Sequence, residues 1–359
     1  MTDSPIDCKD FDTEGLVQFA ESLGQSAFRG KQIMSWLYKP GIVSFDQMTD
    51  LAKSFRELLH KHATISFFSE PIIEQSQDGS IKFGFVLADS NIIESVLIPE
   101  EDRLTLCISS QVGCSMGCSF CGTAYLGFTR NLSPSEIVNQ VVAVRDYLIS
   151  NHLIDKVQKS EITNLVFMGM GEPLNNFDNL ITAINILTDQ KGLDIASRRI
   201  TVSTCGIVHH MKKLGERTSI NLAISLHAVD NQTRNLLMPI NKKYPIEVLI
   251  EACKNYPMKK RKRIMIEYVM LDGVNDSLEE AHELARLLQA VPCKINLLTY
   301  NPTENLPYQG SSREKMIGFQ NVLRQKHYSV FIRSSRGSDI AAACGQLAGK
   351  LRGGSYARQ

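Results

Sequence analysis

Three cysteines stand close together in the segment GCSMGCSFCGTA (residues 113–124), namely Cys114, Cys118 and Cys121. A structural zinc site normally closes its shell with four protein ligands, and no nearby histidine or second Cys-x-x-C pair supplies a fourth one here. A four-iron cluster held by three thiolates leaves one iron open, so this set favours such a cluster. A zinc knuckle, or three unrelated buried cysteines, is the alternative interpretation.

The open iron of such a cluster can bind a small molecule through an amine and a carboxylate. The methionine part of S-adenosylmethionine carries both groups. An electron from the cluster can then split the sulfonium and generate a carbon radical. The cysteine segment directly follows the apolar run TLCIS at 105–109, which is typical of a strand. We therefore expect the three cysteines on a loop after the first core strand.

From about residue 100 onward, strand-like runs alternate with helical patterns. The pattern SPSEIVNQVVAVRDYL opens with a capping box from Ser133 to Glu136 and has Pro134 in its first turn. Such alternation indicates parallel βαβ units, and six or seven repeats fit an open or closed α/β barrel. Chemistry in such barrels lies at the carboxyl ends of the strands. The strand-like runs are TLCIS, NLVFMG, RITVST, NLAISL, RIMIEYVM, KINLLTY and YSVFIRS.

The region before residue 100 has a different pattern. Residues 14–62 contain three short amphipathic patterns, and the third, SFDQMTDLAKSFRELLHKH, is expected to form a helix capped by Ser44. Two strand-like runs follow, IKFGFVLAD and NIIESVLIP, and they are joined near Asp89. A small helical module and a β-hairpin are therefore expected ahead of the barrel.

Small and polar residues follow several of the strand-like runs, in FMGMGEP, STCG, SLH and YNP. Glycine at a strand end lets the backbone approach a ligand, and Glu172 could accept a hydrogen bond from a ligand ammonium. Each group alone is more often an ordinary strand terminus, but their recurrence on consecutive strands indicates a binding site. The candidates for binding S-adenosylmethionine are Gly171, Glu172, Ser203, Ser225, Leu226, His227 and Asn301.

The composition, 43% hydrophobic and 21% charged, is that of a globular protein, and no apolar run approaches the ~18 residues of a membrane span. The N-terminal residues lack the features of a signal peptide, so a cytoplasmic protein without a membrane partner is expected. Nine dispersed cysteines favour metal-binding or reactive thiols over a disulfide scaffold. Net charge is only +1, but basic residues gather at 26–65, 259–263 and 344–359, which favours RNA or DNA as a partner. Residues 26–65 and the run KKRKR at 259–263 are expected to hold the RNA backbone.

These features resemble the radical S-adenosylmethionine superfamily, which implies one [4Fe-4S] cluster on Cys114, Cys118 and Cys121. Several strings narrow the resemblance to the RlmN family of dual-specificity RNA methyltransferases, over roughly residues 25–349. The resemblance implies a partial (β/α)6 barrel with a small helical N-terminal domain, and methylation of adenosine C2 in 23S rRNA and in tRNA near the anticodon. The strings are ESVLIPEEDRLTLCISSQVGC, CGTAYLGFTRNLSPSEI, GMGEPLNN, MPINKKYPI, GVNDS and RGSDIAAACGQL.

The resemblance also implies roles for three residues. Cys344, in DIAAACGQL, would accept a methyl group from one S-adenosylmethionine, and a second would supply the radical that activates it. The resulting carbon radical would add to the base and link the protein to RNA. Glu94 matches the base that removes the C2 proton, although acidic residues at 100–102 compete for this role. Cys107 matches the cysteine that frees the RNA through a transient disulfide with Cys344, although its apolar surroundings also suit a core cysteine.

The resemblance further implies a flavodoxin-type electron donor, and a monomer is the default expectation. The expected parts of the chain are a helical RNA-binding accessory domain at 1–65, a β-hairpin extension at 66–99, a radical S-adenosylmethionine core barrel at 100–340, and a C-terminal segment with the acceptor cysteine at 341–359.

Two positions favour C2 over the C8 methylation carried out by antibiotic-resistance relatives. These positions are Pro173 in GEPL and Arg336 in SRGSD. Cys205, in STCG, stands where the family more often has serine and places a further thiol near the site. The alternatives of other classes are a non-catalytic RNA-binding protein with structural zinc, and a radical enzyme acting on a protein or small molecule. The cysteines that match no family motif and are expected to be structural are Cys8, Cys253 and Cys293.

Overall fold

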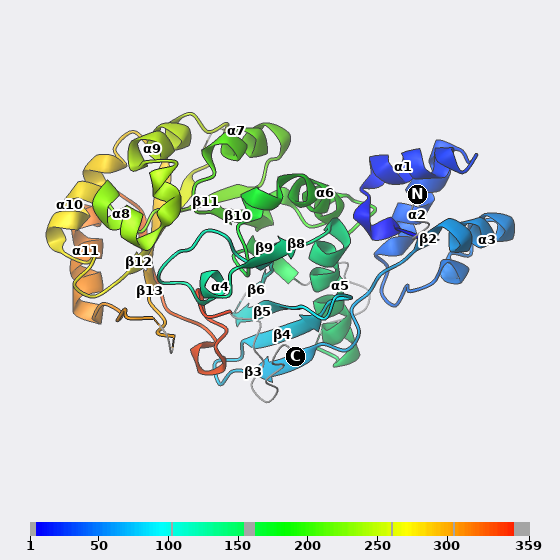
Figure 1. Ribbon diagram of the computed structural model, residues 1–359, viewed down its shortest axis with the longest axis horizontal. Coiled ribbons are helices and arrows are strands. Elements are labelled where there is room, and N and C mark those ends of the chain that lie inside the picture. The colour runs from blue at the N-terminus through cyan, green and yellow to red at the C-terminus, as the bar shows by residue number, and fades with distance from the viewer. Residues whose placement is uncertain (1–4, 102, 154–161, 260, 304–305, 348–359) are drawn as a thin grey trace.

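One open ten-stranded sheet forms the centre of the protein (Figure 1), as seen in a computed structural model that describes residues 5–101, 103–153, 162–259, 261–303 and 306–347. Seven neighbouring strands, β14 to β6 in spatial order, are parallel, and the remaining three are antiparallel. In spatial order the strands are β14 (Val330–Arg333), β13 (Cys293–Thr299), β12 (Ile264–Met270), β11 (Asn221–Ser225), β10 (Ile200–Thr204), β9 (Ile162–Phe167), β6 (Arg103–Cys107), β5 (Ile92–Glu100), β4 (Ile81–Val86) and β3 (Ile72–Gln75).

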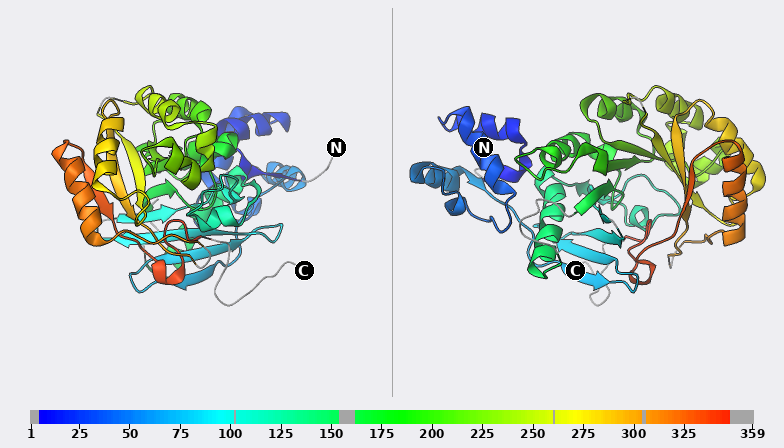
Figure 2. Two further views of the ribbon diagram at one scale, coloured as in Figure 1. Left: turned by 60° about the vertical axis from the view of Figure 1, so that its left-hand side comes forward. Right: turned by 180° about the vertical axis from the view of Figure 1, so that it is seen from behind.

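Each pair of successive parallel strands is joined by a crossover that contains a helix, and these helices cover the outer face of the sheet (Figures 1 and 2). The predicted α/β partial barrel with a small helical N-terminal domain is confirmed. The predicted capping box of Ser133 and Glu136 is also present at the start of α5. The crossover helices are α5 (Pro134–Ser150), α6 (Phe177–Thr188), α7 (Val208–Arg217), α8 (Asn231–Leu237), α9 (Ile246–Lys254), α10 (Leu278–Leu287) and α11 (Arg313–Gln325).

The two faces of the parallel sheet differ in polarity. Successive side chains of a strand point to opposite faces. Leu222, Ile266 and Leu297 are buried under the outer helices, and they supply the hydrophobic core. Ser203 and Ser225, which point to the inner face, are only half-buried. The barrel therefore has an apolar outside that holds the helices and a more polar inside that can face a ligand.

The N-terminal module contains α1 (Thr13–Ser22), α2 (Ala27–Leu37) and α3 (Lys53–His62), closed by the short strands β1 (Ile6–Asp7) and β2 (Ala63–Thr64). The expectation of one helix from Ser44 onward is wrong. Ser44 caps a single 3-10 turn, η2 (Phe45–Gln47), and α3 begins only at Lys53. Buried side chains recur every third residue in this stretch, which suits a turn and an extended link packed against the module. They are Phe45, Met48 and Leu51.

Direct hydrogen bonds join the N-terminal module to α5 of the barrel. The Arg145 Nη1 atom donates to the Tyr38 carbonyl at 2.6 Å, and the buried Lys9 Nζ donates to Asn139 Oδ1 at 2.8 Å. The Ser135 backbone N–H, in the first turn of α5, donates to Asp10 at 2.9 Å. These contacts fix the module beside the barrel, as Figure 2 shows.

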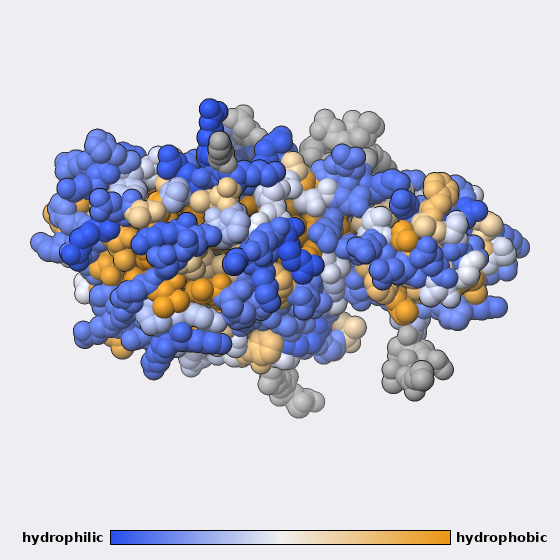
Figure 3. Space-filling view, turned by 90° about the horizontal axis from the view of Figure 1, so that it is seen from above, coloured by the Kyte–Doolittle hydropathy of each residue, from blue (hydrophilic) through white to orange (hydrophobic). Residues whose placement is uncertain are grey.

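The predicted hairpin strands are β4 and β5, and β3 adds a third antiparallel strand. β5 extends to Glu100 and pairs with β6, so the hairpin continues the barrel sheet rather than standing apart. No helix in the described residues is long and apolar enough to cross a membrane. Figure 3 shows a mainly hydrophilic surface, with apolar patches over both the barrel and the N-terminal module.

Candidate active site

The three clustered cysteines lie on the loop that follows β6, between the short paired strands β7 (Gln111–Gly113) and β8 (Phe128–Asn131). This is the carboxyl end of the parallel strands, as predicted. Gly113 has φ of +73°, and a Cβ there would sit 1.9 Å from the Gly127 carbonyl oxygen. The next residue, Cys114, donates its N–H to that carbonyl at 2.8 Å. Glycine at 113 therefore lets the loop turn back tightly and present its thiols.

The three thiols are half-buried and influence one another. Burial raises the pKa of Cys114 to about 12. Burial and the charges of Cys121, Cys114 and Glu172 raise the pKa of Cys118 well above its usual value. Within the described residues, no three His, Cys, Asp or Glu side chains converge on a single metal ion. Three thiols on one loop fit a cluster, in which each thiolate binds a different iron.

Gly171 and Glu172 lie at the end of β9 and are packed tightly. Gly171 has φ of +100°, and a Cβ there would sit 2.5 Å from the Gln111 side chain. The buried Glu172 carboxylate accepts from the Leu174 N–H at 3.0 Å and from the Cys205 N–H at 2.8 Å. The structure thus shows Glu172 tying the ends of β9 and β10 together.

The other predicted ligand-binding residues lie at the ends of the next strands. His227 is buried, has φ of 59°, and its Nδ1 accepts from the Val269 N–H at 3.0 Å. Burial, together with the nearby Arg234 charge, lowers the pKa of His227 to about 3. The ring is therefore neutral and carries its proton on Nε2, where it can donate. Ser203 and Ser225 are half-buried, whereas Leu226 and Asn301 are buried.

Arg234, which sequence reasoning missed, holds this rim together. Its fully buried guanidinium donates to the carbonyls of Cys205 at 2.8 Å, Ser225 at 3.2 Å and Leu226 at 3.1 Å. It also donates to Asn241 Oδ1 at 3.0 Å. Arg234 therefore orders the ends of β10 and β11 and places a fixed positive charge beside Cys118. Its only signal in the sequence was its place shortly before MPINKKYPI.

Cys205 belongs to the same region. Burial, the charge of Glu172 and a hydrogen bond to its carboxylate raise the pKa of the Cys205 thiol well above its usual value. Cys118 and Cys114 also contribute, so the additional thiol lies beside the three-cysteine loop. The other three unassigned cysteines are buried, as expected for structural residues.

The C-terminal segment reaches the mouth of the barrel (Figure 1, red). The Gly122 N–H, in α4 (Gly122–Tyr125), donates to the Gly345 carbonyl at 2.7 Å. Thr123 donates to the Leu347 carbonyl at 2.6 Å, and Asn301 Nδ2 donates to the Cys344 carbonyl at 3.4 Å. The cysteine loop and the end of β13 thus hold Cys344 over the barrel.

Cys344 and Cys107 lie close enough for the charge of one to act on the other. Burial and the charge of Cys344 raise the pKa of the Cys107 thiol. Cys344 as a residue is exposed to solvent, but its thiol is closely surrounded by protein atoms. This local burial, together with the charges of Glu267 and Cys121, raises the pKa of the Cys344 thiol to about 11. Both thiols are free, as are all other cysteines of the chain. Two residues far apart in the sequence thus influence one another electrostatically.

Glu94 shares a sheet face with Cys107, because Val96 pairs with Cys107 and side chains two residues apart point the same way. Glu94 is buried and lies 3.5 Å from the Nζ of Lys82. The same Nζ is 3.5 Å from Glu74 and donates to the Ile340 carbonyl at 2.8 Å. Lys82, which sequence reasoning missed, thus links Glu94 to the segment that carries Cys344.

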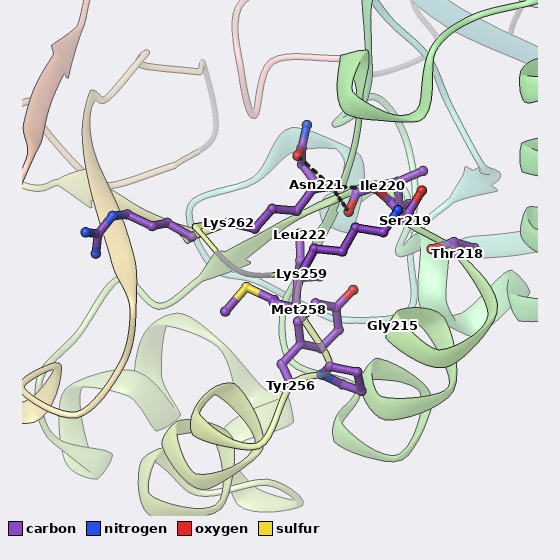
Figure 4. A pocket seen from close by; sticks show the side chains of 12 residues that line it. Gly215, Thr218, Ser219, Ile220, Asn221, Leu222, Tyr256, Met258, Lys259 and Lys262 are labelled. Carbon is purple, nitrogen blue, oxygen red and sulfur yellow. Dashed lines mark hydrogen bonds between the residues drawn. The ribbon is translucent and has the colours of Figure 1, made fainter.

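The basic run at 259–263 lies at the other end of the barrel. It precedes β12, so it is near the amino ends of the strands, away from the cysteine loop. A cavity of 290 Å³ lies there (Figure 4), lined in part by Lys259, Lys262 and Arg263. Lys262 donates to the Ser219 carbonyl, which is a structural role. The run is not brought to the active face, and Lys260 lies outside the described residues.

Comparisons with known proteins agree with this geometry. Residues 6–65 match the family described as "Ribosomal RNA large subunit methyltransferase N-terminal domain", and residues 108–287 match the "Radical SAM superfamily". A solved structure, "Crystal Structure of a radical SAM methyltransferase from Sphaerobacter thermophilus", superimposes with a TM-score of 0.87 at 40% identity, covering 96% of this chain and 100% of that one. The partial barrel with its three-cysteine loop thus defines a radical S-adenosylmethionine protein.

Curated relatives narrow the class further. A "Dual-specificity RNA methyltransferase RlmN" of Desulfotalea psychrophila is 61% identical over 96% of this chain and 95% of its own. The protein of the same name from Geobacter sulfurreducens is 48% identical over 97% of this chain and 94% of its own. The chain belongs to the RlmN family.

Proposed function

We propose that this protein methylates C2 of adenosine in 23S rRNA and in tRNA near the anticodon. The supporting observation is the position of Cys344, which lies over the barrel mouth between the cysteine loop and Cys107. C2 of adenine is an electron-poor carbon and a weak nucleophile, so direct attack on a sulfonium methyl group is disfavoured. A cysteine that first carries the methyl group provides another route.

The residues at the mouth of the barrel have different proposed roles. Cys114, Cys118 and Cys121 hold one [4Fe-4S] cluster, which with S-adenosylmethionine supplies the radical chemistry. His227 donates through Nε2, and the half-buried Ser203 and Ser225 offer hydroxyl groups to the same ligand. Cys344 takes the methyl group from one S-adenosylmethionine, and a second is used in each turnover to activate it. The radical takes one hydrogen atom from the S-methyl group, and the carbon radical that remains adds to C2, which links the base to the protein through Cys344.

Release of the product falls to Glu94 and Cys107. Glu94 removes the proton from C2, and Lys82 keeps the buried carboxylate next to a positive charge. Once the base-linked radical has given up one electron, Cys107 loses its proton and its sulfur attacks the Cys344 sulfur. The bond from the Cys344 sulfur to the methylene carbon breaks and a disulfide forms. The electron pair of the broken bond stays on the carbon, which takes a proton and becomes the C2 methyl group. That disulfide must be reduced before the next turnover. A flavodoxin-type protein is the proposed electron donor for the radical step, and a monomer is the proposed state.

Methylation at C2 rather than C8 is supported by Pro173 and Arg336. Mass spectrometry of the modified nucleoside tests this assignment directly. The expected product is 2-methyladenosine, whereas 8-methyladenosine alone would contradict the C2 proposal.

RNA contact is proposed for the N-terminal module, through Arg29 and Lys31 of α2. An adenosine must leave its stack to enter the barrel, so backbone contacts outside the mouth have to hold the RNA open. Reversing both charges should weaken RNA binding and flatten its dependence on salt. Reversing the charges of Lys259 and Arg263, at the far end of the barrel, is the matched control and should change neither. An N-terminal reversal without effect would contradict this contact.

The carrier role is tested by peptide mapping of protein purified without oxygen. Cys344 is expected to carry the extra mass of one methyl group. Replacing the buried Cys253 by alanine is the control, and it should leave that methyl group in place. An unmodified Cys344 in cluster-loaded protein supplied with S-adenosylmethionine would contradict the carrier role. Zinc in place of iron at the three cysteines would support the non-catalytic alternative.

A further inference from the structure

A buried polar pair lies on the inner face of the barrel and has no role in the steps above. Glu267 of β12 and Asn296 of β13 are partners in the parallel register. They are 5% and 7% exposed, and Asn296 Nδ2 donates to Glu267 Oε1 at 2.9 Å. Ser225 of β11 is in register with Glu267. The pair therefore sits at the same level of the barrel as a candidate ligand-binding serine.

One atom of this pair lacks a partner. The Oδ1 of Asn296 is buried and accepts no hydrogen bond from the residues that the structure describes. Nearly all buried polar groups in folded proteins are paired, because an unpaired acceptor costs about 1–3 kcal/mol. When Glu267 is ionised, its carboxylate accepts from the amide NH2 group of Asn296, so Oδ1 is left for a donor from outside the chain. Water or a ligand group has to fill that place.

We propose that Asn296, oriented by Glu267, is an adenine-recognition residue inside the barrel. The unpaired Oδ1 accepts from the 6-amino group of an adenine, and the second N–H of the amide donates to the adjacent ring nitrogen. A side-chain amide and an adenine edge have matching donors and acceptors. Guanine presents a carbonyl oxygen at the 6-position, which would meet Oδ1 unfavourably.

Two different adenines are candidates for binding to Asn296, and both present the same 6-amino group and ring nitrogens. One belongs to S-adenosylmethionine, and the other is the target base of the RNA. The location supports either source, because Ser225 lies beside Glu267 in the sheet and the Glu267 charge acts on Cys344. The charge of Arg333 acts on Glu267, and the charge of Cys121 acts on Cys344. The inference about the target base rests on the proposed function, whereas the inference about S-adenosylmethionine does not.

The test uses cluster-loaded, full-length protein with Asn296→Ala and Glu267→Gln. Asn221→Ala is the matched control, because Asn221 lies on β11 near the amino ends of the strands and donates to the Arg198 carbonyl at 2.8 Å. The first measurement is equilibrium binding of S-adenosylmethionine without RNA. The second is methylation of RNA that carries either adenosine or purine riboside, which lacks the 6-amino group, at the target position.

Asn296→Ala should change one measurement by about 10- to 100-fold, the range expected for a paired amide–adenine contact. A loss of affinity for S-adenosylmethionine would assign the contact to its adenine. Loss of the wild-type preference for adenosine over purine riboside would assign it to the target base. Glu267→Gln should show a smaller change in the same measurement, because glutamine can still accept from the amide.

Unchanged binding and unchanged preference in Asn296→Ala would overturn the proposal. If this variant does not fold, wild-type protein still decides the question. The proposal is then overturned by equal binding of S-adenosylmethionine and its 6-deamino analogue, together with equal methylation of the two RNAs. The binding measurement requires no methyl transfer, so it stays readable even if the proposed C2 methylation fails.

Discussion

Replacing Glu267 by glutamine should stabilise the protein at pH 8 but not near pH 4.5. Burial of Glu267 raises its pKa from 4.5 to about 7, while Asn296 and Arg333 oppose the shift only in part. The native state therefore holds a proton that the unfolded state releases between these two pH values. Stability of the wild type consequently falls as pH rises through this window.

The magnitude follows from the size of the shift. At about 1.4 kcal/mol for each pKa unit, a rise of roughly two and a half units corresponds to at most about 3.5 kcal/mol. Glutamine has the same shape, stays uncharged and still accepts from the Asn296 amide. The free energy of unfolding of the variant should thus exceed that of the wild type by up to ~3.5 kcal/mol at pH 8. The difference should shrink toward zero near pH 4.5.

Urea unfolding of the iron-free chain at pH 5 and pH 8 measures this difference, because bound metal would break two-state behaviour. Glu57→Gln, at an exposed position of α3, is the control and should show no such pH-dependent gain. A Glu267→Gln difference that is equal at both pH values would refute the reasoning. So would a variant that is less stable than the wild type at pH 8.

Three further variants test the positioning of the site. Arg234→Met leaves four buried acceptors without their donor and should lower the free energy of unfolding by about 3 kcal/mol or more in urea titrations. Arg286→Met, at an exposed i,i+3 pair, should cost under about 1 kcal/mol. Lys82→Met breaks a buried ion pair and should lower the free energy of unfolding by about 3–5 kcal/mol. It should also reduce the methylation of Cys344 measured by peptide mass, because Lys82 holds the segment that carries Cys344. Full methylation of Cys344 in this variant would contradict that link. Gly113→Ala should lower the iron bound per chain, because its Cβ would meet the Gly127 carbonyl; wild-type iron content would refute this.

Much of the fold was predictable because it depends on local patterns. Each strand-like run beyond residue 100 became a strand of the parallel sheet, and Ser133 capped its helix through contacts within one turn. The exception, the stretch after Ser44, shows where local patterns are insufficient. Its amphipathic pattern predicts one helix, but its buried side chains pack against the module as a turn and a later helix.

The chemistry of the site was likewise visible in part. The spacing of three cysteines on one loop, and small or polar residues at strand ends, depend only on sequence position and strand order. The sequence determined which residue types were available to the mouth. It could not show that the carboxylate of Glu172 is already engaged by two backbone amides.

Tertiary structure alone decided which distant groups meet. Arg234 belongs to an ordinary polar stretch and Lys82 to the apolar run IKFGFV. Only the folded sheet surrounds them with acceptors and carboxylates from other elements. The pair of Glu267 and Asn296 exists only because two parallel strands align in one register. Strand register decides which side chains become neighbours. Burial raises the free-energy cost of leaving any of their polar atoms unpaired. The sequence carries the residues, and folding sets their neighbours, their charges and their free lone pairs.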